Sequence, residues 1–144
     1  MPKNKQLRLV IDTNLWISFI ISNKLNLLDP LLFAGELRLI FSAELIFEIQ
    51  ETMAKPRLRK FFLPKSLEEM LSYFEPFIDL IEVESVVTIC RDVKDNFLLA
   101  LAKDGNADYL LTGDKDLLVI EKFGKTKIIT IVGFLDLKKK LPLT

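Results

Sequence analysis

The chain has 144 residues, of which 50% are hydrophobic and 28% are charged, so it can bury the core of one ordinary domain. This composition excludes the low-complexity and disordered classes of protein. Twenty basic residues balance twenty acidic ones, so binding of nucleic acid would have to rest on a local patch of charge. We expect a single domain over residues 1–144.

The chain contains no histidine. This excludes Ser-His-Asp and Cys-His nucleophile systems, imidazole acid–base nuclease chemistry and every zinc site that uses histidine. The one cysteine, Cys90, cannot form an internal disulfide, and we expect it to be a small buried hydrophobe in a reducing compartment. If the chain is an enzyme, carboxylates must carry most of its chemistry.

The apolar runs are short or are broken by charges, and none approaches the ~20 residues that a membrane-spanning helix needs. The first residues lead directly into a strand-like stretch, with neither an apolar signal-peptide core nor a small-residue cleavage site. The sequence therefore predicts a cytoplasmic protein without a membrane segment.

Strand-like and helix-like stretches alternate along the chain, with capping residues and glycines at their ends. The expected strands are residues 7–11, 37–41, 78–83, 108–112 and 127–130. The expected helices are residues 15–22, 27–34 (ending at Gly35), 43–54, 64–77, 92–104, a short one that begins at Gly113-Asp114, and 133–140. This alternation predicts right-handed crossovers and a mainly parallel sheet of about five strands, covered by helices on both faces.

Acidic residues recur where the expected strands end. Asp12 follows the first strand, and Asp114 and Asp116 follow the fourth. Asp95 lies in the first turn of the helix that leads into the fourth strand. Because functional groups of a parallel sheet gather beyond the carboxyl ends of its strands, these three segments are expected to present acids at one edge.

The helix expected over residues 43–54 offers a further acid. At 100° per residue, Glu48 lies on the flank of the apolar stripe, whereas Glu44 and Glu51 project further toward solvent. Glu48 is therefore the acid of this helix that is best placed to reach an internal cleft. The stripe consists of Leu45, Ile46, Ile49 and Met53.

Each aspartate taken alone also has a simpler interpretation as a helix cap. Asp12, Asp92 and Asp114 stand at expected N-cap positions, and Asp95 stands at the third position of a possible capping box. Capping does not explain why acids gather at several strand ends in a chain without histidine. We therefore favour a shared carboxylate site.

Four carboxylates within ~4 to 6 Å would repel by about 4 kcal/mol per closest pair at an effective dielectric constant near 20. Such a cluster must bind either protons or cations. Oxygen-only ligand sets suit hard ions such as Mg²⁺ and Mn²⁺. These ions lower the pKa of a bound water and stabilise charge on the attacking and leaving oxygens of a phosphodiester.

The ordered series of motifs resembles the PIN domain, and in particular the VapC-like toxins of bacterial and archaeal toxin–antitoxin systems. The similarity spans nearly the whole chain and rests on five motifs, of which the last in chain order is the most specific. The motifs are Val10-Ile11-Asp12-Thr13-Asn14, Ser42-Ala43-Glu44-Leu45-Ile46-Phe47-Glu48-Ile49, Lys55-Pro56-Arg57-Leu58, Asp92-Val93-Lys94-Asp95-Asn96 and Thr112-Gly113-Asp114-Lys115-Asp116-Leu117-Leu118. An isolated Asp-Thr-Asn is weak evidence, whereas the ordered series is strong.

The resemblance implies a PIN-like (Rossmann-like) three-layer α/β/α sandwich. It also implies a metal-dependent endoribonuclease that hydrolyses RNA phosphodiesters with a water activated by Mg²⁺ or Mn²⁺. Asp116 would be a supporting metal ligand, directly or through water. The acids that the resemblance makes both catalytic and metal-binding are Asp12, Glu48, Asp95 and Asp114.

The family pattern often has a proline where Val93 stands and a charged residue where Phe47 stands, and neither difference affects a ligand. Asn14 and Thr112 would support the ligands or contact the substrate. Such toxins are commonly silenced by a small antitoxin protein and frequently form homodimers or higher oligomers. The resemblance thus implies RNA, an antitoxin and a second copy of the chain as partners.

A basic segment follows the helix that contains Glu48. It could follow an RNA backbone or be a solvated helix end, and both interpretations remain open. Trp16 and Phe19 offer rings for stacking on bases, although core packing or an oligomer interface is the favoured interpretation of both. The bases of the segment are Lys55, Arg57, Arg59 and Lys60.

Other functions also fit a carboxylate site. A metal-dependent phosphatase or DNA nuclease would use the same ions, and a non-catalytic PIN module would bind RNA or a protein without cutting. An aspartyl-phosphate phosphatase would need a second acid two places after Asp12, where Asn14 stands. A phospho-acceptor signalling domain would need a mid-sheet aspartate and a later strand-end lysine, and neither is evident.

Overall fold

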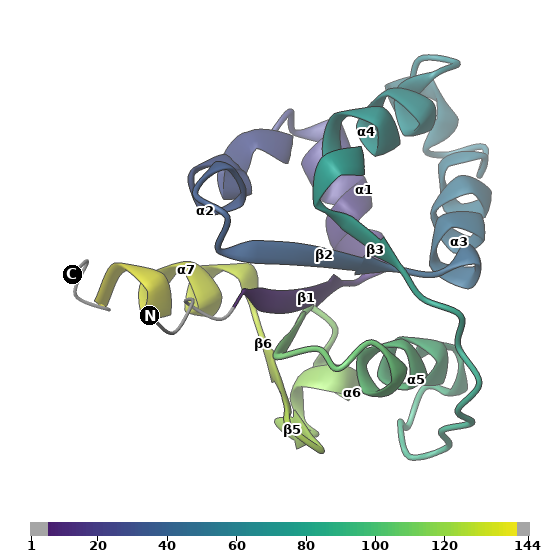
Figure 1. Cartoon of the computed structure of the whole chain (residues 1–144). Helices are drawn as coiled ribbons and strands as arrows, with labels where there is room; N and C mark the ends of the chain where they lie inside the picture. The colour runs from purple at the N-terminus through teal and green to yellow at the C-terminus, as the bar shows by residue number, and fades with distance from the viewer. Residues whose placement is uncertain (1–5, 141–144) are drawn as a thin grey trace.

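A sheet of six strands separates two layers of helices (Figure 1). The computed structural model describes residues 6–140. The strand order is β3-β2-β1-β4-β6-β5, and every neighbouring pair is parallel except β5 and β6. The strands are β1 (Leu7–Ile11), β2 (Leu37–Phe41), β3 (Ile78–Leu80), β4 (Tyr109–Leu111), β5 (Lys122–Phe123) and β6 (Thr126–Ile129).

Helices α1 to α4 lie on one face of the sheet, and α5 and α6 lie on the other (Figure 1). The predicted three-layer α/β/α sandwich is therefore confirmed. The α-helices of the described residues are α1 (Thr13–Ile21), α2 (Asp29–Phe33), α3 (Ala43–Met53), α4 (Ser66–Phe74), α5 (Asn96–Asp104), α6 (Lys115–Leu118) and α7 (Ile131–Lys140). Single 3₁₀ turns are η1 (Leu25–Leu28), η2 (Arg59–Phe61), η3 (Glu75–Phe77) and η4 (Val93–Asp95).

The chain reverses its direction of travel across the sheet at β1. It first adds β2 and β3 on one side of β1, and later returns to add β4 and β6 on the other side. The chain therefore leaves β1 toward α1 on one face and leaves β4 toward α6 on the opposite face (Figure 1). In open α/β sheets such a switch point forms a crevice beyond the carboxyl ends of the strands.

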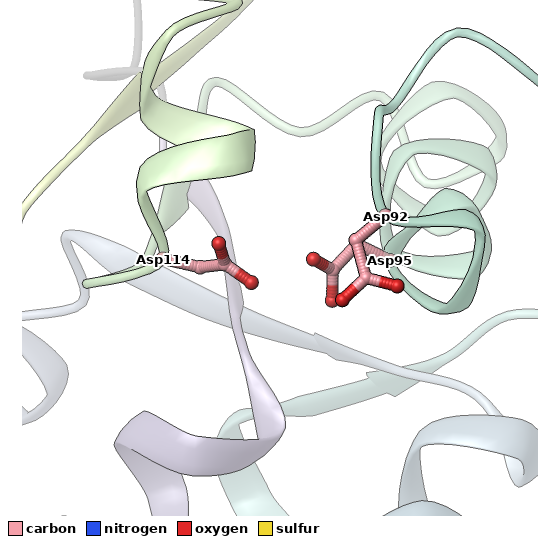
Figure 2. Close-up of side chains that lie close together, drawn as sticks. All are labelled: Asp92, Asp95 and Asp114. Carbon is pink, nitrogen blue, oxygen red and sulfur yellow. The ribbon is translucent and has the colours of Figure 1, made fainter.

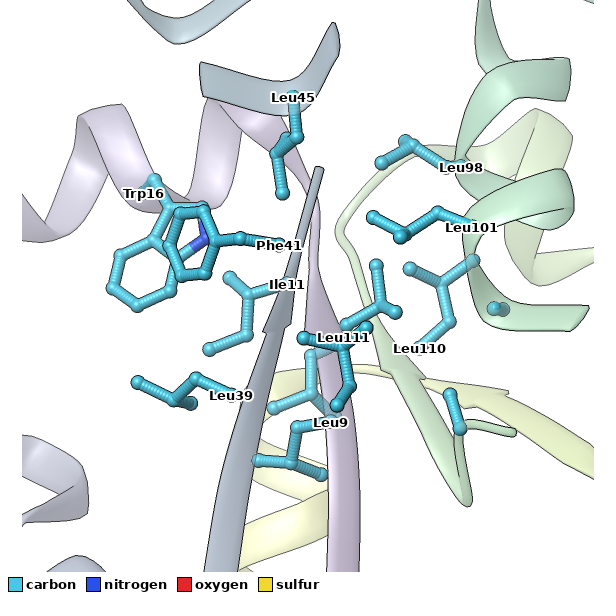
Figure 3. Close-up of a cluster of buried hydrophobic side chains, with 14 of the residues drawn as sticks. Leu9, Ile11, Trp16, Leu39, Phe41, Leu45, Leu98, Leu101, Leu110 and Leu111 are labelled. Atoms are coloured by element: carbon cyan, nitrogen blue, oxygen red, sulfur yellow. The ribbon is translucent and has the colours of Figure 1, made fainter. Parts of the chain in front are cut away.

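An aromatic cluster joins α1, β2 and α4 in the core. The ring centroid of Trp16 lies 5.3 Å from that of Phe41 and 5.5 Å from that of Phe74. Trp16 is 1% exposed and Phe19 is 4% exposed, so neither ring is available for stacking on bases. Core packing is confirmed for both residues. Figure 3 shows Trp16 on the α1 side of the strands, with leucines of α5 on the other side.

The strand expected over residues 78–83 ends at Leu80 instead. After that point the backbone N–H groups of Glu84 and Ser85 donate to the carboxylate of Asp104, at 2.7 and 2.8 Å. This carboxylate at the end of α5 thereby holds the chain after β3. The helix expected over residues 92–104 likewise divides into η4 and α5.

The sheet has one strand more than the five expected. β5 is only two residues long and pairs antiparallel with β6, and Gly124 takes a φ of 59° in the turn between them. Gly35 has a φ of 75° and follows the end of α2, as its predicted capping role requires. Within the described residues, no helix combines the length and the apolar character needed to cross a membrane.

A network of charges ties the three strands of one side together near the amino ends of β1 and β2. Asp79 of β3 accepts hydrogen bonds from Arg8 at 2.7 Å and from Arg38 at 2.5 Å. Arg8 Nε also donates to the carbonyl of Gly105 at 2.7 Å. The hydrogen bond from Arg38, more than that from Arg8, holds the pKa of Asp79 below its ordinary value.

Candidate metal centre

Three carboxylates meet beside the carboxyl end of β4. Within residues 6–140, Asp92, Asp95 and Asp114 each offer an oxygen that lies within 4.8 Å of the others. Figure 2 shows Asp114, in the turn before α6, facing Asp92 and Asp95 in the turn before α5. Two of the predicted site residues, Asp95 and Asp114, are thus brought together. We call these three residues the acidic cluster.

Asp12 lies beside the acidic cluster in a fixed orientation. Its side chain is the N-cap of α1, because Oδ1 accepts the Leu15 backbone N–H at 2.7 Å, and Oδ2 accepts the hydroxyl of Thr112. Burial raises the pKa of Asp12; these two hydrogen bonds oppose the shift, and the charge of Asp114 adds to it. The carboxylate is therefore held in place near the cluster, and no basic side chain among residues 6–140 pairs with it.

Thr112 links two of the acids. Its hydroxyl donates to Asp12 and accepts the backbone N–H of Asp114 at 2.9 Å. Its own backbone N–H donates to Ile129 of β6 at 3.0 Å, and the residue is 1% exposed. Because β6 fixes Thr112 and Thr112 contacts both acids, this threonine can set their relative positions, which fits the supporting role expected of it.

Asp95 occupies the least favourable position of the cluster. Its side chain caps no helix, so the capping-box interpretation of Asp95 is wrong. Its Oδ2 is buried and has no hydrogen-bond partner among the described residues. Burial, followed by contact with Asp114 and the charges of Asp114, Asp92 and Asp12, raises the pKa of Asp95 to about 8. At neutral pH this group therefore holds a proton unless a cation replaces it.

The donor set fits a divalent metal ion. All three groups of the acidic cluster are oxygen donors, which hard ions such as Mg²⁺ and Mn²⁺ prefer. The buried, unpartnered oxygen of Asp95 provides a coordination position that the protein itself does not satisfy. Binding of a cation would relieve both the repulsion and this unsatisfied oxygen.

Glu48 borders the cluster from α3 but is not a member of it. As predicted, Glu48 is half-buried whereas Glu44 and Glu51 are exposed. Burial raises the pKa of Glu48; the charges of Lys55 and Lys94 oppose the shift, and that of Asp92 adds to it. The charge of Asp92 therefore acts on Glu48, although Glu48 is not one of the three acids that meet within 4.8 Å.

Asp116 also lies outside the acidic cluster as defined by its oxygen distances. Its backbone N–H donates to Oδ1 of Asp114 at 2.9 Å, so Asp114 is the N-cap of α6. Asp114 and Asp12 therefore both cap a helix, and Asp114 also belongs to the acidic cluster, with Asp12 beside it. One turn of helix holds Asp116 next to Asp114.

Sequence reasoning assigned Asp92 only a capping role and missed it as a site residue. Its Oδ1 does accept the Lys94 backbone N–H, at 3.1 Å, and its carboxylate also joins the acidic cluster. The signal was the spacing of Asp92 and Asp95, since residues three apart in a helical turn project from the same side.

Cys90 and Asn96 hold the segment that carries Asp92. The Cys90 backbone N–H donates to Asn96 Oδ1 at 2.8 Å, and the Cys90 thiol lies 3.6 Å from the carbonyl of Asp116. Cys90 is 4% exposed, which confirms it as a small buried hydrophobe, and burial raises the pKa of its thiol. Asn96 is the second residue of structural importance to the site that the sequence did not reveal.

The basic segment after α3 lies at the surface. The charge of Lys55 at the start of the segment opposes the upward pKa shift of Glu48. Lys60 Nζ lies 5.3 Å from the ring centroid of Phe61. The four exposed bases are Lys55, Arg57, Arg59 and Lys60.

The sheet with acids at its switch point is the architecture of a class of metal-dependent nucleases. The model of the PIN domain family matches residues 8–116, and the chain therefore belongs to this family. The matched region contains all five predicted metal-site acids and Asp92. PIN domains are typically metal-dependent nucleases, and an acidic cluster is present among the described residues of this chain.

A search of the curated proteins found no match. Among the solved structures, the chain is similar to the crystal structure of PAE2754 from Pyrobaculum aerophilum. The TM-score is 0.55 and the sequence identity is 15%, over 96% of this chain and 100% of the other. At this identity the similarity supports the fold and no more.

Proposed function

We propose that this PIN domain is a metal-dependent endoribonuclease that hydrolyses RNA phosphodiesters. The observation that carries the proposal is the meeting of Asp92, Asp95 and Asp114 within 4.8 Å beside the buried Asp12. No basic side chain pairs with these four carboxylates among the described residues, so a bound ion would supply the balancing charge in place of the proton that Asp95 holds without it.

In this proposal Asp92, Asp95 and Asp114 hold Mg²⁺ or Mn²⁺, with Asp12 as a further ligand. When bound, the ion supplies positive charge that lowers the pKa of water and stabilises a phosphodiester during hydrolysis. Thr112 and the Leu15 backbone N–H keep Asp12 in one orientation. Asp95, which holds a proton at neutral pH, releases that proton when the ion binds.

Glu48 and Asp116 support the centre from its rim, through water, in the same proposal. The charges of Lys55 and Lys94 and that of Asp92 all act on Glu48. RNA then approaches over the basic segment of residues 55–60, where a phosphate backbone finds exposed positive charge next to the site. Catalysis and binding are thereby carried by neighbouring surfaces.

The VapC-like motifs support a biological role as the toxin of a toxin–antitoxin system. In that role a small antitoxin protein covers the site, the chain forms a homodimer or a higher oligomer, and one domain in the cytoplasm carries the whole activity. Expression in a bacterium without the antitoxin is expected to arrest growth, and Asp114→Asn is expected to relieve the arrest. Growth arrest by both chains would argue against a toxin that acts through this site.

The decisive experiment is the incubation of purified protein with a mixed pool of structured and single-stranded RNA, in Mg²⁺, in Mn²⁺ or in excess chelator. Asp12→Asn, purified in the same way, is the control. Metal-dependent cleavage by the native chain alone would support the proposal. Equal cleavage by both proteins would identify a contaminating ribonuclease.

The same assay separates the alternative functions. DNA and a phosphate monoester are added as competing substrates, because a DNA nuclease or a phosphatase would use the same ions. Preferential hydrolysis of either would replace the ribonuclease by that activity. Calorimetry with Mn²⁺ completes the test: failure to cleave any substrate and to bind the ion would favour a non-catalytic PIN module.

A further inference from the structure

An open hollow of about 320 Å³ adjoins the acidic cluster on the side of α1. Its volume is at the lower end of the range for small-molecule sites, about 300 to 1,000 Å³. Two of its lining residues are acids of the proposed metal centre, so a ligand in the hollow would lie next to the reacting phosphate. The lining residues are Asp12, Asn14, Leu15, Ser18, Gly113 and Asp114.

Two uncharged polar side chains line this hollow from α1. Asn14 and Ser18 are four residues apart on the helix, so their side chains are neighbours on one face. Both are exposed, and neither side chain makes a hydrogen bond within residues 6–140. The amide of Asn14 and the hydroxyl of Ser18 each offer both a donor and an acceptor. They can therefore bind either type of polar edge.

The remaining lining suits a flat ligand without charge. Leu15 is half-buried and contributes apolar surface beside the polar groups. None of the lining residues is basic, so the hollow is not built to receive a phosphate group. A ribonucleoside has the complementary chemistry, because its base has apolar faces and polar edges and its ribose carries hydroxyls.

Gly113 lies in the wall of the hollow although the fold does not require a glycine there. Its φ lies outside the left-handed region, and an added Cβ would meet no atom within 4 Å. By contrast, Gly35 has a φ of 75°, and a Cβ on Gly105 would lie 2.6 Å from a side-chain carbon of Ile40. Gly113 therefore leaves space that the protein itself does not use.

We propose that this hollow is the subsite for the nucleoside joined to the scissile phosphate, and that Asn14, Ser18 and Gly113 determine which nucleosides it admits. The inference rests on the proposed ribonuclease function. Asn14 and Ser18 hydrogen-bond to the nucleoside, and the absent side chain of Gly113 lets the nucleoside approach the wall. The enzyme therefore has a sequence preference at one position next to the cut.

The first test fills the hollow from two sides, with Gly113→Val and with Ser18→Leu. Ser72→Leu, which changes an exposed serine of α4, is the matched control. The expected loss in kcat/KM for RNA is about tenfold for each filling variant, and the nucleotide frequencies next to the cut change. Asn14→Ala changes those frequencies without filling the hollow. The Ser72 variant cleaves like the native chain.

Mn²⁺ affinity is measured for every variant, because Gly113 adjoins Asp114 in the chain. The affinity of the filling variants is expected to stay within about twofold of the native value, since none removes a carboxylate. Native kcat/KM and native cleavage-site frequencies in both filling variants would overturn the proposal. So would a loss of activity that only follows a loss of Mn²⁺ affinity.

The second test does not depend on catalysis. Each of the four ribonucleosides is titrated into isotopically labelled protein in chelator, and backbone amide shifts are recorded by NMR. The expected shifts centre on Asn14, Ser18 and Gly113, and Gly113→Val and Ser18→Leu remove them. Nucleoside binding without RNA cleavage would leave the subsite standing while the proposed function fails. RNA cleavage without such shifts, and with filling variants of native activity, would retain the nuclease and reject the subsite.

Discussion

Aspartates occupy opposite electrostatic environments at the two ends of this sheet. Near the amino ends of β1 and β2, Asp79 contacts two guanidinium groups at 2.7 and 2.5 Å, and its pKa is lowered. Beyond the carboxyl end of β4, Asp95 faces other acids, and its pKa is raised to about 8. An aspartate side chain therefore stabilises the fold near the amino ends of the strands, whereas another destabilises it beyond their carboxyl ends.

The difference follows from what each end must do. The charges around Asp79 are complete within the chain, so that end needs no ligand and holds three strands in register. The acidic cluster has no balancing cation among the described residues, which makes it unstable alone and receptive to a cation. A site that binds a cation must lack a balancing positive charge from the protein's own side chains. Such sites commonly reduce the stability of the fold.

The largest effect on the acidic cluster, beyond the carboxyl end of β4, is expected from Asp114→Asn. Asparagine can still cap α6, so the fold is expected to persist while the charge is lost. Cleavage of RNA is expected to fall by on the order of a thousandfold, because the cluster loses the acid that faces both others. Asp136→Asn, on the exposed face of α7, is the control and should keep native kcat/KM. A variant at position 114 that keeps most of its activity would contradict the proposed centre.

The corresponding change at the amino end is Asp79→Asn, which is expected to affect stability instead of chemistry. It leaves Arg8 and Arg38 facing each other without an anion. We expect a loss of about 2 kcal/mol in the free energy of unfolding, below the range for fully buried pairs because these side chains are partly exposed. Urea denaturation measures the loss, and a midpoint like that of Asp136→Asn would show that the network contributes little.

The pH dependence of protein stability, measured in chelator, distinguishes the two ends of the sheet without a mutation. Asp95 has a folded pKa of about 8 and a reference value of 3.8, so its contribution to stability is complete below the reference value and is lost as pH rises toward 8. Asp79 has a lowered pKa, so its contribution is complete above 3.8 and is lost as pH falls below it. The melting temperature should therefore fall as pH rises from 3.8 to about 8, the interval between the two pKa values of Asp95, and level off above it.

Two controls make that pH dependence specific to the acidic cluster. Asp95→Asn should remove the fall in melting temperature at rising pH, because it removes the group that gives up the proton. Saturating Mn²⁺ should also remove the fall, since the ion favours the deprotonated carboxylates. A melting temperature that rises steadily to pH 8.5 in chelator would show that Asp95 is already ionised in the native state.

A smaller effect is expected at the buried acid that adjoins the cluster. In chelator, Asp12→Asn should leave the free energy of unfolding unchanged or raise it by about 1 kcal/mol, because it removes a buried charge repelled by Asp114. The amide can still accept the Leu15 N–H that caps α1. Denaturation in chelator measures the change. A clear loss of stability would mean that the ionised carboxylate of Asp12 stabilises the fold.

The alternation of strands and helices could be predicted from the sequence because it rests on local patterns. The apolar strands before Asp12 and Asp114 and the flank position of Glu48 follow from residue spacing alone. The path of the chain after β3 could not be predicted, since Glu84 and Ser85 bond to Asp104, about twenty residues further on. A contact between distant segments leaves no periodic signal in either of them.

The same limit explains the outcome for the site. Asp12 and Asp114 could be predicted as site candidates because they follow predicted strands, whose carboxyl ends meet at one edge. Asp92 was missed because its carboxylate reaches Asp114 only after the turn before α5 packs against the turn before α6. A capping role was a sufficient explanation of Asp92 in the sequence. Only the three-dimensional structure shows that its carboxylate both caps the turn and joins the acidic cluster.

The smallest effect concerns charge that RNA meets before it reaches the acids. Arg57→Ala should reduce the slope of log Kd against log salt concentration by about 1, because one phosphate contact is lost. Lys122→Ala on β5, at the far edge of the sheet, is the matched control and should keep the native slope. Binding is measured with Asp114→Asn so that the RNA stays intact. An unchanged slope for the Arg57 variant would make the basic segment a solvated helix end, and RNA would then reach the acidic cluster by another face.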